Sequence, residues 1–352
     1  MSRALSEFLA QRTQRLDSPQ ALGECLRALV HEQLANLPSA GSGHTLERWR
    51  CLASVAAHDL GLCKLYEGHT DALAIMAELK SAGAQSGGTW GMWAAEPPQA
   101  RVTLSGPGND VRLNGRKAWC SGAAVLSHAL ITAWDAQGRQ QLVAVVLDQP
   151  GVTVTTEGWS AVGMAATGSV EVLFENAQVM TIGEPGDYLS RPGFWQGGIG
   201  IAACWYGACC SIAQRLAQSS RQREEPHALA HLGAVDTALF SASEVLQNAA
   251  HWIDQYPTAN AQLLARRCRA VVEHAAQQVI EHVGRALGAG PYCKDAQFAR
   301  LMADLPVFLR QSHAERDLAT LGKLLATGSA DVTTQPGTVS HADVAPMGSW
   351  SL

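Results

Sequence analysis

The hydrophobic pattern of the chain changes its period twice, and this order constrains the fold more than any other feature. Apolar residues recur at helical spacing through residues 1–86. From about 89 to 184 the pattern is that of strands: short runs rich in β-branched residues, such as LVAVVLD and SVEVLFE, are separated by Gly, Pro or Asn-Gly. After Pro185 the helical period returns, and it is strongest over 264–287. The order predicts a multi-domain α+β fold with an N-terminal helical domain, a central antiparallel, barrel-like β domain and a C-terminal helical bundle.

The same changes of pattern set the predicted domain boundaries. A chain of 352 residues is long enough for two or three packed units. We predict an N-terminal helical domain over 1–86, a middle β domain over 87–184 and a C-terminal helical bundle over 185–327. Residues 328–352 hold Gly, Ser, Thr and Pro without a period, which predicts a loose tail.

Charge and hydropathy exclude several classes of partner. The net charge is −5, whereas a protein that binds nucleic acid or an anionic membrane needs an excess of clustered Lys and Arg. No run approaches eighteen consecutive apolar residues, so we expect no membrane span. The first residues, MSRALSEFLAQRTQRLD, lack the hydrophobic region of a signal peptide, and we therefore expect a cytoplasmic protein.

Cysteine spacing and one acidic cluster bear on metal binding. The nine cysteines form no CxxC pair, which favours buried reduced thiols over a zinc site or a disulfide scaffold. Glu67, His69 and Asp71 lie close together in EGHTD, and such clusters can bind metal. No second His pair follows, and the segment is also typical of a loop in which Thr70 caps the next helix. We therefore predict a structural or substrate-contact role for the cluster, and no metal site.

Three segments resemble one large flavoprotein family. Residues 92–98 (MWAAEPP) and 111–123 (VRLNGRKAWCSGA) resemble its aromatic-x-x-Thr-Glu-Pro and Leu-Asn-Gly-x-Lys-x-Trp-Ile-Thr/Ser-Gly segments. Residues 158–179 are similar to the closing strands of its β domain. Residues 285–305 resemble its Gln-x-x-Gly-Gly-x-Gly turn and the following helix with an Arg-Asp pair. On these segments and the domain order, the chain resembles a divergent acyl-CoA dehydrogenase, whose fold also serves acyl-CoA oxidases and flavin monooxygenases.

The resemblance implies FAD as cofactor and assigns the first candidate binding residues. In the family the first two segments lie against the isoalloxazine ring, which places Trp93, Ala95, Trp119 and Ser121 at the flavin. Residues two apart on a strand share a face, so each pair would present its side chains together. Ala95 stands where the family usually has Thr, so one side-chain hydrogen bond to the flavin would be missing. In the alternative interpretation Trp119 belongs to the apolar core and Ser121 merely ends a strand.

The far end of the dinucleotide gives four more candidates. The family's Gly-rich turn approaches the dinucleotide of a neighbouring subunit, which implicates Gly288, Gly290 and Arg285. Arg285 replaces the family's Gln, and an arginine can bind a pyrophosphate. Arg221 lies near the position of a pyrophosphate-binding Arg. The alternatives are a simple helix stop at the glycines and a solvated charge cluster around Arg221.

The catalytic base of the family is missing from its expected positions. Most members carry a glutamate eight residues after the Asp of the Arg-Asp pair, and the same count from Asp304 ends at Ser312. The other position used in the family lies within 188–223, which contains neither Asp nor Glu. A serine hydroxyl is a poor base for a weakly acidic C–H. His313 follows directly and is similar to the histidine that a helix presents to the flavin in monooxygenases of this fold. Alternatively, 313–323 is an amphipathic helix with a solvated histidine.

Three functional hypotheses follow. The first is an acyl-CoA dehydrogenase-like oxidoreductase that acts on an acyl thioester or another small molecule with an electron-transfer partner and a replaced base. The second is a flavin-dependent monooxygenase that uses His313. The third is a relative that has lost catalysis and serves as a binding or assembly subunit. The apolar faces of helices 193–217 and 260–287 additionally predict a homodimer or homotetramer.

Overall fold

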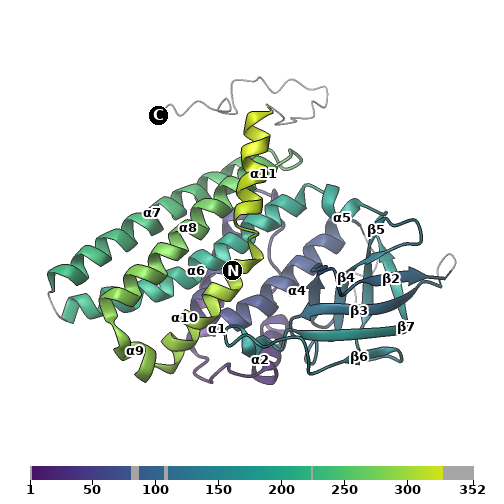
Figure 1. Ribbon diagram of the computed structural model, residues 1–352, viewed down its shortest axis with the longest axis horizontal. Helices are drawn as coiled ribbons and strands as arrows, with labels where there is room; N and C mark the ends of the chain where they lie inside the picture. Colours follow the sequence, from purple (N-terminus) through teal and green to yellow (C-terminus); the bar gives the residue numbers. More distant parts are fainter. Residues whose placement is uncertain (1, 81–86, 107–109, 223–224, 328–352) are drawn as a thin grey trace.

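Helices, strands and helices follow one another along the chain in the predicted order, so the α+β fold class is confirmed. The computed structural model describes residues 2–80, 87–106, 110–222 and 225–327, and the predicted tail at 328–352 lies outside these residues. In Figure 1 the strands gather at the right, the long helices α6, α7 and α8 lie at the left, and α4 runs between the two groups.

The N-terminal block consists of helices with well-formed starts. Its helices are α1 (Ser2–Ala10), α2 (Pro19–His31), α3 (Thr45–His58) and α4 (Leu60–Glu78). Helix α2 begins at Ser18, whose hydroxyl accepts the N–H of Ala21, with Pro19 in the first turn. Helix α4 begins at Asp59, whose Oδ1 accepts the N–H of Leu62 at 2.8 Å.

The predicted loop at EGHTD is wrong. Helix α4 continues through residues 67–71, and the hydroxyl of Thr70 bonds back to the carbonyl of Glu67 instead of capping a new helix. The helix survives its internal glycine because it is packed along β1 and buries most of its length. Glu67 and Asp71 therefore lie one turn apart on the same face of a helix.

The middle block is a seven-stranded sheet that closes on itself. Its strands are β1 (Trp90–Trp93), β2 (Val102–Ser105), β3 (Arg112–Cys120), β4 (His128–Trp134), β5 (Gln140–Val146), β6 (Val152–Val154) and β7 (Val170–Ile182). The order is β1-β4-β2-β3-β7-β5, with β6 on β7, and β5 also pairs with β4. That last pairing closes β4, β2, β3, β7 and β5 into a barrel, with β1 attached to β4 and β6 to β7. Most pairings are antiparallel as predicted, while β1–β4 and β2–β4 are parallel.

The C-terminal block is a bundle built on three long helices. Its helices are α5 (Asp187–Ser190), α6 (Gly193–Gln222), α7 (Pro226–Gln255), α8 (Gln262–Leu287), α9 (Ala289–Lys294), α10 (Ala296–Phe308), the 3₁₀ turn η3 (Leu309–Gln311) and α11 (Glu315–Ala326). Pro306 lies in the last turn of α10. None of the described helices combines the length and apolarity needed to span a bilayer.

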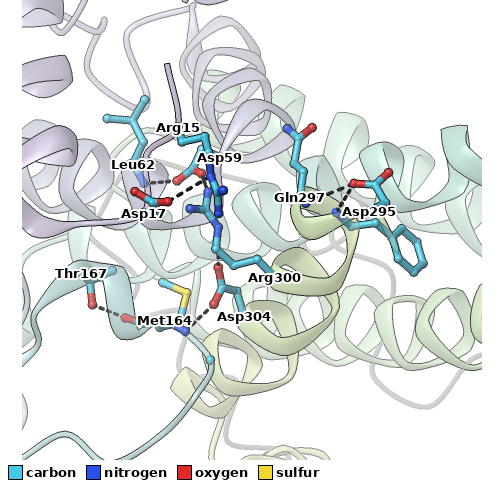
Figure 2. Close-up of polar contacts among 12 residues, drawn as sticks. Arg15, Asp17, Asp59, Leu62, Met164, Thr167, Asp295, Gln297, Arg300 and Asp304 are labelled. Atoms are coloured by element: carbon cyan, nitrogen blue, oxygen red, sulfur yellow. Dashed lines mark hydrogen bonds and ion pairs between the residues drawn. The ribbon is translucent and has the colours of Figure 1, made fainter. Parts of the chain in front are cut away.

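A buried charge cluster joins the three blocks, and Figure 2 shows Arg300 between Asp59 and Asp304. Arg300 of α10 forms an ion pair with the Asp59 carboxylate at the start of α4 and lies 3.8 Å from Asp304. Asp304 also accepts the backbone N–H of Met164 from the middle block. Burial raises the pKa of Asp304, opposed by that N–H and by Arg300. The Arg300–Asp304 pair identified in the sequence thus connects α10 to the N-terminal helices and to the middle block.

Candidate active site

A cavity of about 1230 Å³ lies where the three blocks meet. Its walls come from α4, the segment after β1, the end of β3, the start of α6, the middle of α8 and residues 307–318. Six of the ten predicted site residues line it: Trp93, Ala95, Trp119, Ser121, Ser312 and His313.

The barrel wall presents an aromatic ring that the protein leaves half uncovered. Trp119 is 50% exposed, so it is a cavity-lining residue and not a member of the apolar core. Ser121 lies just beyond β3, and its hydroxyl is 2.7 Å from that of Ser169. The indole N–H of buried Trp93 donates to the Ser121 carbonyl at 3.2 Å. The pattern of one open ring beside fixed hydroxyls suits a flat, polar-edged ligand.

Three non-glycine residues with a left-handed backbone line the same cavity. Trp119, Met164 and Ala314 all line it, and their φ angles are +58°, +58° and +46°. A left-handed conformation at a non-glycine residue costs about 1–3 kcal/mol and persists where the surroundings enforce it, often at functional sites. For Trp119 the cause is local, since the register of β3 against β7 shifts between Lys117 and Cys120. The shift turns the indole away from the barrel core.

A buried lysine fixes the segment that carries Ala95. Glu96 accepts hydrogen bonds from the Thr132 hydroxyl (2.7 Å) and the Trp134 indole (3.0 Å), and it lies 3.6 Å from Lys117 Nζ. Lys117 is fully buried, and burial lowers its pKa to about 8, opposed by Glu96. This network, which holds 94–98 as one cavity wall, was not assigned from the sequence. The available signal was weak, because β3 also carries Arg112, Asn114 and Arg116, and only burial distinguishes its lysine from them.

The opposite wall carries Ser312 and His313 on a connection instead of a helix. Ser312 has extended backbone after η3, and α11 starts only at Glu315, so the predicted helical spacing between these residues is wrong. The buried Ser312 hydroxyl accepts the N–H of Ala314 at 3.0 Å. The His313 side chain is 65% exposed, and its Nδ1 lies 3.9 Å from Asp317. A histidine on the cavity rim thus stands beside Ser312, the position that the resemblance predicts for the family's carboxylate.

Ion pairs that sequence reasoning missed line the rest of the cavity. They are Lys64–Glu67 (2.8 Å), Arg266–Asp317 (2.9 Å) and Arg310–Glu273 (2.8 Å). Burial raises the pKa of the Glu67 carboxyl, opposed by Lys64. Helical spacing placed these residues on helix faces but could not distinguish a cavity wall from a solvated face. In the part of the chain that the structure describes, no cluster of three or more His, Cys, Asp or Glu has the geometry of a metal site.

Four predicted residues lie away from the cavity in a single chain. Arg221 is in the last turn of α6, and Arg285 in α8 pairs with Glu281 at 2.9 Å. Gly288 ends α8 with φ +62° and ψ −162°, a conformation open essentially to glycine alone, and Gly290 lies in α9. Their predicted role toward a neighbouring subunit's dinucleotide stays a prediction.

The sequence comparisons agree with the resemblance drawn from the motifs. Residues 94–177 match the acyl-CoA dehydrogenase middle domain. Over 224 residues the chain is 29% identical to the probable acyl-CoA dehydrogenase FadE2 of Mycobacterium tuberculosis (strain ATCC 25618 / H37Rv), a match over 57% of this chain and 54% of the relative. The match thus spans about half the length of that curated relative.

Solved structures share the fold over nearly the whole chain. Methanesulfinate monooxygenase MsuC from Pseudomonas fluorescens superposes with a TM-score of 0.76 at 19% identity, covering 95% of this chain and 97% of that one. KijD3, solved with FMN and dTDP-3-amino-2,3,6-trideoxy-4-keto-3-methyl-D-glucose, gives a TM-score of 0.77 at 18% identity, covering 93% and 94%. The predicted resemblance is confirmed, and its relatives support a flavin-dependent oxidoreductase.

Proposed function

We propose that this chain, a divergent acyl-CoA dehydrogenase-like flavoprotein, is a flavin-dependent monooxygenase. The observation that carries the proposal is the cavity wall at 312–313, where a buried serine and a histidine lie at the position that the count from Asp304 predicts for the family's carboxylate base. Of the carboxylates close to this wall, Asp317 accepts the N–H of His313 and pairs with Arg266, which hold its pKa below the usual value despite partial burial, and Glu273 pairs with Arg310. Oxygen transfer needs no base for a C–H proton, whereas acyl-CoA dehydrogenation does.

The residues of the cavity fit a flavin. The half-exposed Trp119 ring offers a stacking face, and the Ser121 and Ser169 hydroxyls offer hydrogen bonds to the polar edge of a ring. When bound and reduced, a flavin supplies two electrons to O₂, so that one oxygen atom enters the substrate and the other leaves as water. In this proposal His313 supplies a proton to the oxygen that leaves, and Asp317 fixes the backbone of His313 by accepting its N–H at 3.0 Å. Trp93 fixes the Ser121 carbonyl and so the position of that strand end.

FMN is proposed in place of the FAD predicted from the sequence, because KijD3, which shares the fold, was solved with FMN. The residues assigned to the dinucleotide end lie outside this cavity, in keeping with their predicted role toward a neighbouring subunit, and the Arg285 guanidinium is paired with Glu281. Reducing equivalents come from an electron-transfer partner in this proposal.

Replacement of His313 by alanine is expected to lower oxygen transfer by about 10²–10⁴-fold, the usual contribution of a positioned acid or base. The assay mixes the FMN-loaded, reduced protein with O₂ and substrate and quantifies oxygenated product against hydrogen peroxide. His274→Ala is the matched control, because His274 lines the same rim from α8 and bonds only to Gln278.

The same proposal excludes ordinary dehydrogenation. Octanoyl-CoA should leave the flavin oxidised in the absence of oxygen, in the wild type and in the Ser312→Glu variant alike. Rapid bleaching of the wild-type flavin under these conditions would show instead that the chain is an acyl-CoA dehydrogenase with an unrecognised base. A folded protein that binds neither FMN nor FAD would favour the binding or assembly subunit.

We also propose that the chain forms a homodimer or homotetramer through α7 and α8. Phe240 is 65% exposed on α7, and Leu229 and Val271 lie exposed on α7 and α8. Exposed apolar side chains on one helical layer usually mark an interface. Light scattering at micromolar concentration should give a multiple of 37.3 kDa for the wild type. Phe240→Glu should lower this mass, and a monomeric wild type would contradict the proposal.

A further inference from the structure

We propose that the end of the cavity formed by α4, α5 and α6 binds a cationic amine of the substrate, with Asp71 as the counter-ion. The inference rests on the proposed function in one respect, namely that this cavity is the substrate site. It replaces the acyl chain implied by the family resemblance with a different class of substrate.

Among the charged side chains of the cavity walls, the Asp71 carboxylate has no hydrogen-bond donor within the described residues. Ion pairs engage most of the charged side chains there, namely Lys64–Glu67, Arg191–Glu78, Arg266–Asp317 and Arg310–Glu273, while Arg269 donates to the carbonyls of Gly198 and Gln311. Asp71 is different, because it forms neither a hydrogen bond nor an ion pair with any residue that the structure describes. Buried Arg48 contributes charge nearby, but its guanidinium donates to the carbonyls of Pro38 and Thr70. An acceptor carboxylate thus faces the cavity without a donor.

Free space lies in front of the Asp71 carboxylate. The start of α6 lies opposite Asp71 and presents Gly197 and Gly198 to the cavity. A Cβ added to Gly197 would lie 3.3 Å from Asp71 Oδ1, whereas one added to Gly198 would meet no atom within 4 Å. The helix therefore offers bare backbone beside the carboxylate, and a ligand group has room to approach it.

Aromatic side chains of α5 and α6 form a wall of the same end of the cavity. Tyr188, Phe194 and Trp195 form two edge-to-face contacts with ring centroids 5.4 and 5.1 Å apart. Arg191 lies over Tyr188 at 5.5 Å and Arg266 over Trp195 at 5.0 Å, so these rings already bind cations of the protein itself. Each arginine is neutralised by its own carboxylate, so the wall remains compatible with a further organic cation.

The side-chain oxygen of Gln140 is a second hydrogen-bond acceptor without a donor in the described part of the chain. The side-chain oxygen of Gln140 is buried and has no hydrogen-bond partner within the described residues, and Gln140 lines the same cavity. The Gln140 carbonyl accepts the N–H of Gly186 at 2.8 Å, two residues before Tyr188, which places it at the α5 end. Buried polar atoms are normally satisfied, so two free acceptors predict a ligand with several N–H donors. A protonated amine has three.

An acyl chain does not provide the hydrogen-bond donors that these two acceptors require. Its methylene groups would displace water from the Asp71 carboxylate without supplying a hydrogen-bond donor in its place, which is unfavourable. An ammonium group removes the same water and replaces it with a charge-assisted hydrogen bond.

The inference is tested by calorimetric titration of the FMN-loaded, oxidised protein with three matched ligands: phenethylamine, 2-phenylethanol and 3-phenylpropionate. The amine should bind at least 10-fold more tightly than the alcohol or the acid. Asp71→Asn should weaken amine binding by about 10- to 100-fold, the range for a hydrogen bond to a charged group, and leave alcohol binding unchanged. Asp148→Asn is the control, because Asp148 is exposed on the barrel and outside the cavity.

Three outcomes would overturn the inference: equal binding of amine and alcohol, an Asp71→Asn variant that binds the amine as the wild type does, or tighter binding of octanoyl-CoA than of the amine. If Asp71→Asn does not fold, Asp71→Glu serves instead, and it should retain the preference for the amine. The titration uses neither oxygen nor reductant. Amine binding without oxygen transfer would therefore contradict the monooxygenase proposal and leave this inference standing.

Discussion

Replacing Trp119 with alanine is expected to weaken FMN binding by about 10- to 100-fold, since loss of an aromatic stacking face and its burial amounts to about 1–3 kcal/mol. The ring is half-exposed in the protein, and in the proposed site the flavin covers it. Fluorescence quenching during FMN titration measures the affinity, and a parallel titration with FAD tests the choice of cofactor.

The Trp119→Ala substitution is also expected to affect thermal stability differently with and without bound flavin. Trp119 adopts φ +58°, a conformation that an indole-bearing residue resists, and its side chain adds little to the apolar core. The alanine variant should therefore retain the thermal stability of the wild type without flavin while losing the stabilisation that FMN confers. Trp119→Phe keeps a ring and should retain most of the affinity. A folded Trp119→Ala variant with unchanged FMN affinity would place the flavin elsewhere.

Arg300→Ala is expected to destabilise the protein by about 3–5 kcal/mol, the usual result of removing one partner from a buried ion pair. Two buried carboxylates, Asp59 and Asp304, lose their shared cation in this variant. Urea denaturation followed by circular dichroism gives the free energy of unfolding. Arg285→Ala is the control, because its ion pair with Glu281 lies on the surface and its loss should leave stability measurably unchanged.

The loss in the Arg300→Ala variant should depend on pH in a defined direction. Burial already raises the pKa of Asp304, and removal of Arg300 raises it further. The folded state then holds a proton at a pH where the unfolded carboxyl has lost it, so folding takes up a proton and stability increases as the pH falls. The difference from the wild type should shrink between pH 7 and pH 5. A difference that stays constant over this range would assign the loss to packing rather than to charge.

The architecture could be predicted because it depends on patterns that repeat. Three blocks follow from the change between a period near 3.6 and a period of two, and the barrel closes where those periods predict strands. Local exceptions escaped prediction. The EGHTD segment contains residues common in loops, yet tertiary burial of α4 overrides them. The parallel pairing of β1 with β4 depends on long-range contacts that no short pattern encodes.

The candidate site was predictable where a motif fixed the local backbone. Trp93, Trp119 and Ser121 reach one cavity because their strand segments carry the family's spacing. The ion pairs from α8 were not predictable, since a polar residue on an amphipathic helix faces either solvent or a cavity with the same periodicity. The sequence places Asp71 in an acidic cluster, but the absence of a donor for its carboxylate among the described residues depends on the packing of α6, which brings glycines opposite it.

The two walls of the cavity differ in how firmly they are attached. Trp119 belongs to a closed barrel, and its strand cannot leave without breaking the ladder to β7. Helix α11 follows the Ser312–Ala314 connection and contains no buried residue, and the ion pair between Arg266 and Asp317 ties it to α8. Local unfolding has a low free energy where few apolar contacts must be broken. Fluctuations that expose the cavity to solvent are therefore expected to begin at residues 312–326, before the barrel wall that carries Trp119 opens, so that ligand exchange requires no global unfolding.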